Sequence, residues 1–243
     1  MSTDDQRCPI AVTMGDPAGV GPEIAIKARA ALGASLPFFW IGDPRHLPAG
    51  TDCTVIEHPS QAHSVAPASL PVLAHPFPTL AQPGTAAPAN AAATIAVIER
   101  AVGLVRGGEA SALCTAPIHK KALKDGAGFA FPGHTEFLAH LAGTPRVVMM
   151  LAAPDLRTVP VTIHEALADV PRLLTGELLT ETLRITRTGL IRDFGLSNPR
   201  IAVAGLNPHA GEGGAMGREE IELITPTLDR LRAEGFDLAE IGR

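Results

Sequence analysis

Short apolar runs alternate along the chain with longer segments of helical periodicity. Most of the runs are continuously apolar, which is typical of strands covered on both faces. We therefore predict strands of a largely parallel sheet at residues 10–14, 38–41, 112–115, 147–151, 158–162 and 201–204.

Five segments carry helix signals. Three show the punctuation of a helix, a Pro or polar residue at the start and Gly at the end, at residues 22–32, 90–106 and 135–142. Two longer segments, 177–194 and 218–234, are amphipathic. Their apolar stripes consist of Leu179, Leu183, Leu190 and Phe194, and of Ile221, Ile224, Leu228 and Leu231. The alternation of strands and helices predicts a layered α/β/α architecture.

Length and charge narrow the class of protein. A chain of 243 residues forms one large or two modest α/β domains. With 20 Lys and Arg against 25 Asp and Glu, the net charge of −5 argues against a broad nucleic-acid-binding face. The three cysteines, Cys8, Cys53 and Cys114, form no C-x-x-C pair, so neither a disulfide framework nor a zinc ribbon is expected. These features predict a cytoplasmic protein.

Neither a signal peptide nor a membrane span is expected. Residues 1–7 are acidic and no apolar signal region follows them. Residues 58–98 contain no Asp, Glu, Lys or Arg, but prolines recur from Pro59 to Pro88 and interrupt the segment. A spanning helix needs roughly 20 continuous apolar residues, so we interpret this segment as a Pro/Ala-rich excursion on a soluble protein.

A glycine-rich turn at residues 14–23 joins the first predicted strand to the first helix. Glycine lets a backbone approach a ligand, and a helix N-terminus favours anions. Gly15, Gly19 and Gly21 do not match G-x-G-x-x-G, and no Walker lysine is present, so Rossmann and P-loop motifs are excluded. The alternative is a tight turn that packs the helix on the strand.

Two adjacent lysines, Lys120 and Lys121, follow the predicted strand at 112–115. A lysine in this turn can hold a phosphate or carboxylate as a point charge, whereas a solvated pair is the alternative. Because the side chains of adjacent residues rarely point inward together, we favour Lys120 over Lys121 as the lysine that binds the phosphate or carboxylate.

The string Gly133-His134-Thr135 precedes a predicted helix. Thr135 is expected to be the N-cap. His134 is not needed for capping and can hydrogen-bond an oxyanion at the mouth of the helix.

Two further histidines, His164 and His209, each follow a predicted strand and lie in a turn, where imidazoles can meet in a cleft and hold a divalent metal. A metal could lower the pKa of a coordinated hydroxyl and polarise a carbonyl. Asn207 and Glu212 are expected to orient His209. A third ligand is not evident. The five other histidines outside these strings are interpreted as surface or core residues: His46, His58, His63, His75 and His140.

In this order, the strings at residues 14–23, 115–120, 132–136 and 205–212 resemble the 4-hydroxythreonine-4-phosphate dehydrogenase family of vitamin B6 biosynthesis. The resemblance extends from about Ile10 to Phe236. Each string is modest alone, but four of them in order with similar spacing are highly specific.

The resemblance implies a homodimer with its active site at the interface and a two-domain α/β fold like that of isocitrate and isopropylmalate dehydrogenases. It implies NAD or NADP and a divalent metal (Zn, Mg, Mn or Co), used to oxidise 4-phosphohydroxy-L-threonine at C3, with decarboxylation to 3-amino-2-oxopropyl phosphate. His134 and Thr135 would contact the substrate, and His164 and His209 would bind the metal. Lys120 and His134 are the predicted catalytic residues.

The sequence also departs from the family. Glu165-Ala166 stands where many members have Leu-Pro, and residues 236–243 lack the usual Gly-Pro-Leu-Pro-type continuation. The resemblance implies that a further C-terminal region of family members supplies the third metal histidine and much of the dinucleotide site. Residues 1–243 are therefore expected to form an incomplete two-domain unit with interleaved domains. Two other hypotheses stay open: a paralogue acting on a phosphorylated sugar acid or an aromatic cis-dihydrodiol carboxylate, and a truncated, non-catalytic remnant.

Overall fold

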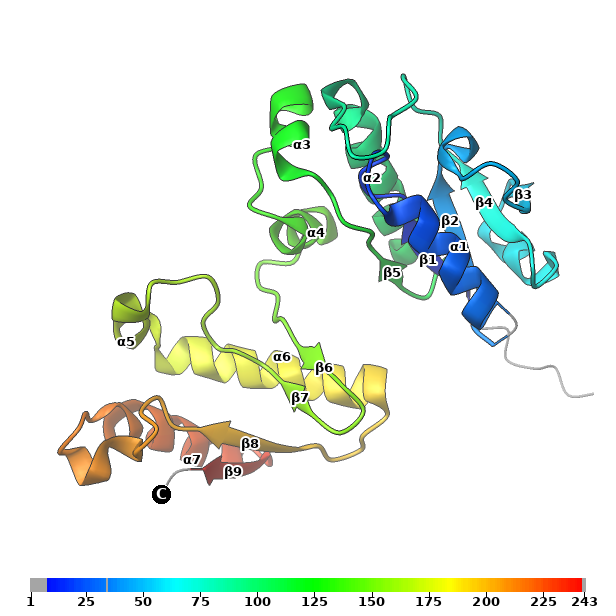
Figure 1. Ribbon diagram of the computed structural model, residues 1–243. Coiled ribbons are helices and arrows are strands. Elements are labelled where there is room, and N and C mark those ends of the chain that lie inside the picture. Colours follow the sequence, from blue (N-terminus) through cyan, green and yellow to red (C-terminus); the bar gives the residue numbers. More distant parts are fainter. Residues whose placement is uncertain (1–7, 34, 242–243) are drawn as a thin grey trace, which may run out of the picture. The chain divides into compact units, whose positions relative to one another are not determined.

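The computed structural model describes residues 8–33 and 35–241. The chain divides into two compact units, Met1–Pro145 and Arg146–Arg243 (Figure 1). The acidic N-terminal residues 1–7 lie outside the described part of the chain.

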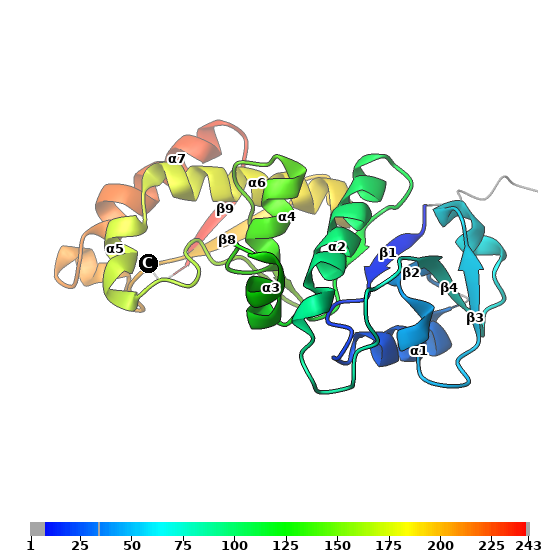
Figure 2. The same cartoon turned by 90° about the horizontal axis from the view of Figure 1, so that it is seen from above.

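The first unit is built on a five-stranded parallel sheet in the order β3-β4-β2-β1-β5. Helices α1 and α2 cover opposite faces of this sheet (Figure 2). This arrangement confirms the α/β class and the strands expected near residues 10, 38 and 112. The elements are β1 (Ile10–Thr13), α1 (Gly21–Leu32), β2 (Phe38–Gly42), β3 (Cys53–Ile56), β4 (Leu70–Ala74), α2 (Ala91–Arg106) and β5 (Leu113–Cys114).

The sheet carries the core of this unit. Phe39, Trp40 and Ile41 on β2 are fully buried. Because consecutive side chains on a strand point to opposite faces, burial of all three requires cover on both faces. Val97 and Ala101 of α2 pack in the same cluster. By length and composition alone, residues 88–106 could span a membrane; in this fold Val97, Ile98 and Ala101 form a buried face of the helix.

Strands β3 and β4 were not predicted. Strand β4 lies inside the charge-free segment 58–98, so the interpretation of this segment as a Pro/Ala-rich excursion is wrong for residues 70–74. The connection before β4 is held by Arg29 of α1, which is 3% exposed. Its guanidinium donates hydrogen bonds to the carbonyl oxygens of Ser69, Val65 and Ala66 at 2.8, 3.2 and 3.0 Å.

Two short helices, α3 (Lys120–Ala127) and α4 (His134–Ala142), pack beside α2 through Leu123, Phe129 and Phe137. Helix α3 was not predicted; the His119 side chain caps it by accepting from the amide of Ala122. Helix α4 begins at His134, with Gly133 at the N-cap. The expectation that Thr135 is the N-cap is therefore wrong, because Thr135 already lies in the first helical turn.

The second unit packs helices α6 and α7 against a parallel pair of strands, β8 and β9. Leu179 and Leu183 of α6 meet Leu228 and Leu231 of α7 in its core. An antiparallel pair, β6 and β7, precedes these elements. The bounds are β6 (Leu151–Ala152), β7 (Arg157–Thr158), α5 (Val170–Leu173), α6 (Gly176–Phe194), β8 (Arg200–Ala204), α7 (Thr225–Ala233) and β9 (Asp237–Ile241).

Short helical turns connect these elements. Among the described residues, five are 3-10 turns and one, η6, is a π turn: η1 (Pro44–His46), η2 (Pro59–Ser64), η3 (Pro88–Asn90), η4 (Leu167–Asp169), η5 (Ala210–Gly214) and η6 (Glu220–Ile224).

Several expectations for the second unit need correction. The strands predicted at 147–151 and 158–162 shrink to the two-residue strands β6 and β7, which pair only with each other in the described chain and whose residues are exposed. Phe194 is 41% exposed and packs on the guanidinium of Arg157, and Ile221 is 42% exposed. The helix predicted at 218–234 begins as the π turn η6 before α7. Residues 237–241 form β9, for which no strand was predicted, and residues 242–243 lie outside the described residues.

Candidate functional site

The first unit has a topological switch point between β1 and β5. After β1 the chain continues to β2 on one side, and after β4 it returns to β5 on the other side of β1. Ligands of open α/β sheets bind at the carboxyl ends of the strands at such a point. The glycine-rich turn follows β1 and the segment 115–120 follows β5, so the first two sequence motifs share this edge.

The two motifs are in direct contact. The amide of Asp16 donates to the carbonyl oxygen of Pro117 at 2.8 Å. Gly15 has φ +72°, and a Cβ added there would lie 2.5 Å from the same oxygen. These contacts support the interpretation of residues 14–23 as a tight packing turn.

The adjacent lysines diverge. Lys121 pairs with Asp125 at 2.5 Å on the exposed face of α3. The Nζ atom of Lys120 instead lies 3.4 Å from the position that a Cβ on Gly133 would occupy. Lys120 therefore reaches the turn that precedes α4, and its catalytic role stays a prediction.

His134 is the first residue of α4 and is half-buried. Its Nε2 atom is buried and has no hydrogen-bond partner among the described residues. Burial of the imidazole lowers the pKa of His134, and the charge of Lys120 lowers it further. The arrangement presents a neutral imidazole beside an ammonium group at a helix N-terminus, which suits an anionic or hydroxyl-bearing ligand. Thr135 is exposed beside it.

His209 lies in a turn after β8, as expected. Its amide donates to the Oδ1 atom of Asn207 at 2.8 Å, and its Nδ1 atom lies 3.6 Å from the Oε1 atom of Glu212. Both residues expected to orient His209 are thus next to it. A hollow of about 400 Å³ is lined by His209, Glu212 and five neighbours: Ala210, Gly213, Glu220, Ile221 and Thr225.

His164 is presented differently. It is exposed and lies in a bend with φ +56°, an uncommon conformation for a residue other than glycine. Strand β7 ends at Thr158, so the expectation that a strand leads directly to His164 is wrong. Within residues 8–33 and 35–241, no group of three His, Cys, Asp or Glu side chains is placed to hold a metal.

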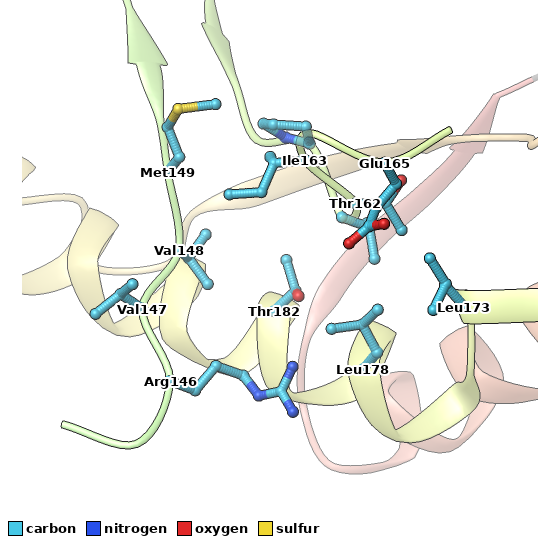
Figure 3. Close-up of a pocket in the computed structure, with 12 residues that line it drawn as sticks. Arg146, Val147, Val148, Met149, Thr162, Ile163, Glu165, Leu173, Leu178 and Thr182 are labelled. Carbon is cyan, nitrogen blue, oxygen red and sulfur yellow. The ribbon is translucent and has the colours of Figure 1, made fainter. Parts of the chain in front are cut away.

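A second hollow, of about 250 Å³, lies next to this bend (Figure 3). Apolar side chains such as Val148 and Ile163 form much of its wall, and Arg146, Glu165 and Thr182 contribute polar groups. Arg146 forms an ion pair with Glu181 of α6. Sequence reasoning missed Arg146 because nothing near it in the chain marks it as part of a hollow.

Comparison with known proteins defines the class. The chain is 56% identical over 231 residues to the 4-hydroxythreonine-4-phosphate dehydrogenase of Roseobacter denitrificans, covering 95% of this chain and 71% of that protein. Identity to the enzyme of the same name from Paracoccus denitrificans is 56% over 234 residues, with the same coverage.

Solved structures agree. The crystal structure of a 4-hydroxythreonine-4-phosphate dehydrogenase from Klebsiella pneumoniae matches with a TM-score of 0.87 and 36% identity, covering 95% of this chain and 74% of that chain. A terephthalate 1,2-cis-dihydrodiol dehydrogenase from Burkholderia xenovorans matches with a TM-score of 0.68 and 29% identity, covering 96% and 72%. The fold is dehydrogenase-like, and the protein is an oxidoreductase.

Residues 34–241 match the model of one family, the pyridoxal phosphate biosynthetic protein PdxA. The chain belongs to the PdxA family.

Proposed function

We propose that this protein oxidises 4-phosphohydroxy-L-threonine at C3 with NAD or NADP, and that the product decarboxylates to 3-amino-2-oxopropyl phosphate for pyridoxal 5'-phosphate synthesis. The observation that carries this proposal is the pair of Lys120 and His134, in a chain 56% identical to dehydrogenases named for this substrate.

Each side chain of the pair has a role in the proposal. The ammonium group of Lys120 supplies a compact positive charge for the phosphate or carboxylate of the substrate. His134 offers a buried Nε2 atom without a partner among the described residues, and a neutral imidazole can exchange a hydrogen bond or a proton with a hydroxyl group. The exposed hydroxyl of Thr135 lies in the same helical turn and would contact the substrate.

The metal would be held by His164 and His209. Both imidazoles are exposed, and Glu212 lies beside the Nδ1 atom of His209, which leaves Nε2 to the cation. Imidazole suits Zn²⁺ and Co²⁺, and substrate oxygens also suit Mg²⁺ and Mn²⁺. When bound, the cation would lower the pKa of the substrate hydroxyl and polarise the carbonyl of the product.

We further propose a cytoplasmic homodimer whose active sites lie at the interface between the two copies. Exposed apolar side chains in the segment of β6 and β7 support this assembly, since Leu151 is 57% and Leu156 is 65% exposed. The three cysteines are free, as suits a reducing compartment.

The test is reduction of NAD or NADP by the purified chain with 4-phosphohydroxy-L-threonine and Mg²⁺ or Zn²⁺, with its molecular mass measured in parallel. Turnover of this substrate by a dimer is expected. An aromatic cis-dihydrodiol carboxylate and a phosphorylated sugar acid are the comparison substrates. The first is chosen because the similar Burkholderia xenovorans protein is named as a dehydrogenase of a terephthalate cis-dihydrodiol. Turnover of a comparison substrate alone would favour the paralogue hypothesis. A folded dimer that turns over none of the three would favour the non-catalytic hypothesis.

A further inference from the structure

One buried carboxylate, that of Glu220, lies behind the turn that carries His209. Glu220 is only 5% exposed. Its Oε1 atom accepts a hydrogen bond from the backbone amide of Asn207 at 3.0 Å. Its Oε2 atom is buried and has no hydrogen-bond partner among the described residues. Burial of a carboxylate with one oxygen unpaired is costly, so stability alone does not account for this residue.

Hydrogen bonds connect Glu220 to His209 through Asn207. The Asn207 side chain accepts from the His209 amide at 2.8 Å and donates to the carbonyl oxygen of Met216 at 3.0 Å. The side chain of Asn207 therefore links the two ends of the loop of residues 205–217. The backbone amide of Asn207 in turn donates to Glu220. Replacement of the Glu220 carboxylate by an apolar group would leave the amide of Asn207 without its acceptor.

The loop is also shaped around this carboxylate. A Cβ added to Gly205 would lie 3.1 Å from Oε1 of Glu220, and one added to Gly211 would lie 3.1 Å from Oε2. On either side of Gly211, Ala210 and Glu212 have φ +48° and +44°, which persist only where the surroundings fix them. Glu220 itself opens the π turn η6, a type of turn frequent at functional sites.

The imidazole of His209 depends on this support. Its side chain is 63% exposed and its Nδ1 atom lies 3.6 Å from the Oε1 atom of Glu212, so the position of the ring is set mainly by its backbone. We propose that Glu220 is a positioning residue for His209: through Asn207 it fixes the backbone that presents the imidazole to the hollow. This inference rests on the proposed function in taking His209 as a metal ligand.

The test compares Glu220→Leu and Glu220→Gln in the full chain, with Glu222→Gln as the matched control. Glu222 lies on the same turn but is exposed and pairs with Arg218. Three quantities are measured: the affinity for Co²⁺, the absorption spectrum of bound Co²⁺, and the amide hydrogen exchange of residues 205–217 in the metal-free protein. Glu220→Leu should weaken Co²⁺ binding about tenfold or more, alter the spectrum and speed exchange. Glu220→Gln, which keeps an acceptor for Asn207, should restore all three, and the control should match the wild type.

Asn207→Ala is the second variant and keeps the test decisive if Glu220→Leu does not fold. Asn207 is partly exposed, and its replacement removes the link between Glu220 and His209, so weaker Co²⁺ binding and faster exchange are expected here too. The proposal is overturned if Glu220→Gln behaves like Glu220→Leu, or if Glu220→Leu and Asn207→Ala leave exchange unchanged. If the wild type binds no Co²⁺, the metal assignment of the proposed function fails, whereas the exchange comparison still decides the role of Glu220.

Discussion

The ammonium group of Lys120 lies close enough to the imidazole of His134 to lower its pKa, adding to the effect of burial. Lys120→Met should therefore raise the pKa of His134, because one of the two causes of the shift is removed. NMR titration of the imidazole would measure this change. Lys121→Met is the control, since Lys121 is paired with Asp125 and should leave the titration unchanged. An unaltered pKa in Lys120→Met would contradict the electrostatic coupling.

The same substitution tests catalysis. Loss of one charged hydrogen bond to the substrate is worth about 1.5–3 kcal/mol, so Lys120→Met should lower kcat/KM by about tenfold to a hundredfold. Steady-state kinetics with Lys121→Met in parallel would show whether the loss is specific to Lys120.

His164→Ala and His209→Ala should each reduce metal affinity by about tenfold or more, the size of effect found for losses around metal sites. Isothermal titration with Zn²⁺ would measure it. His58→Ala serves as a control, because His58 is exposed and its contact, Glu109, lies with it in the first unit, whereas His164 and His209 lie in the second. Wild-type affinity in both His164→Ala and His209→Ala would show that the ligand assignment is wrong.

Gly15 and Gly84 form a matched pair for backbone strain. Their φ angles are +72° and +77°, but an added Cβ meets the Pro117 carbonyl at Gly15 and nothing within 4 Å at Gly84. Gly84→Ala should cost about 1 kcal/mol of unfolding free energy from the left-handed backbone alone. Gly15→Ala should cost clearly more, and urea unfolding of both variants would measure the difference. Equal midpoints would mean that the turn yields without loss.

Acid should destabilise the first unit. Burial lowers the pKa of His46, His75 and His134 below their usual value near 6.5, so the unfolded chain binds more protons than the folded one as the pH falls. The stability that these groups contribute is present above about pH 6.5 and is lost as the pH falls through their folded pKa values. His46 also accepts a hydrogen bond from the Ala81 amide, which an imidazolium cannot do. Urea midpoints between pH 7.5 and pH 5.5 should fall, less steeply in His46→Gln.

The sequence predicts elements well where local pattern and tertiary burial agree. Strand β2 is continuously apolar and fully enclosed, so the pattern sufficed. Strand β4 was missed because Pro71 and its proline-rich surroundings suggest a loop, whereas pairing with β2 and β3 makes it a strand. The apolar run at 147–151 misled in the opposite direction, because it is half-exposed or exposed and forms few strand pairs.

The same distinction applies to the candidate site. Lys120, His134 and His209 lie in short strings with local signals, so they could be proposed from the sequence. Glu220 could not, because its burial arises only when residues 205–217 fold over it. The divergence of Lys120 from Lys121 depends likewise on where α3 and α4 pack.

The guanidinium of Arg29, which belongs to α1, donates three hydrogen bonds to carbonyl oxygens at residues 65–69 of the charge-free segment 58–98. The connection before β4 cannot open without releasing that buried group, which would lose three carbonyl acceptors at once. Opening of this connection is thereby coupled to α1, and the two should behave as one cooperative unit in native-state hydrogen exchange.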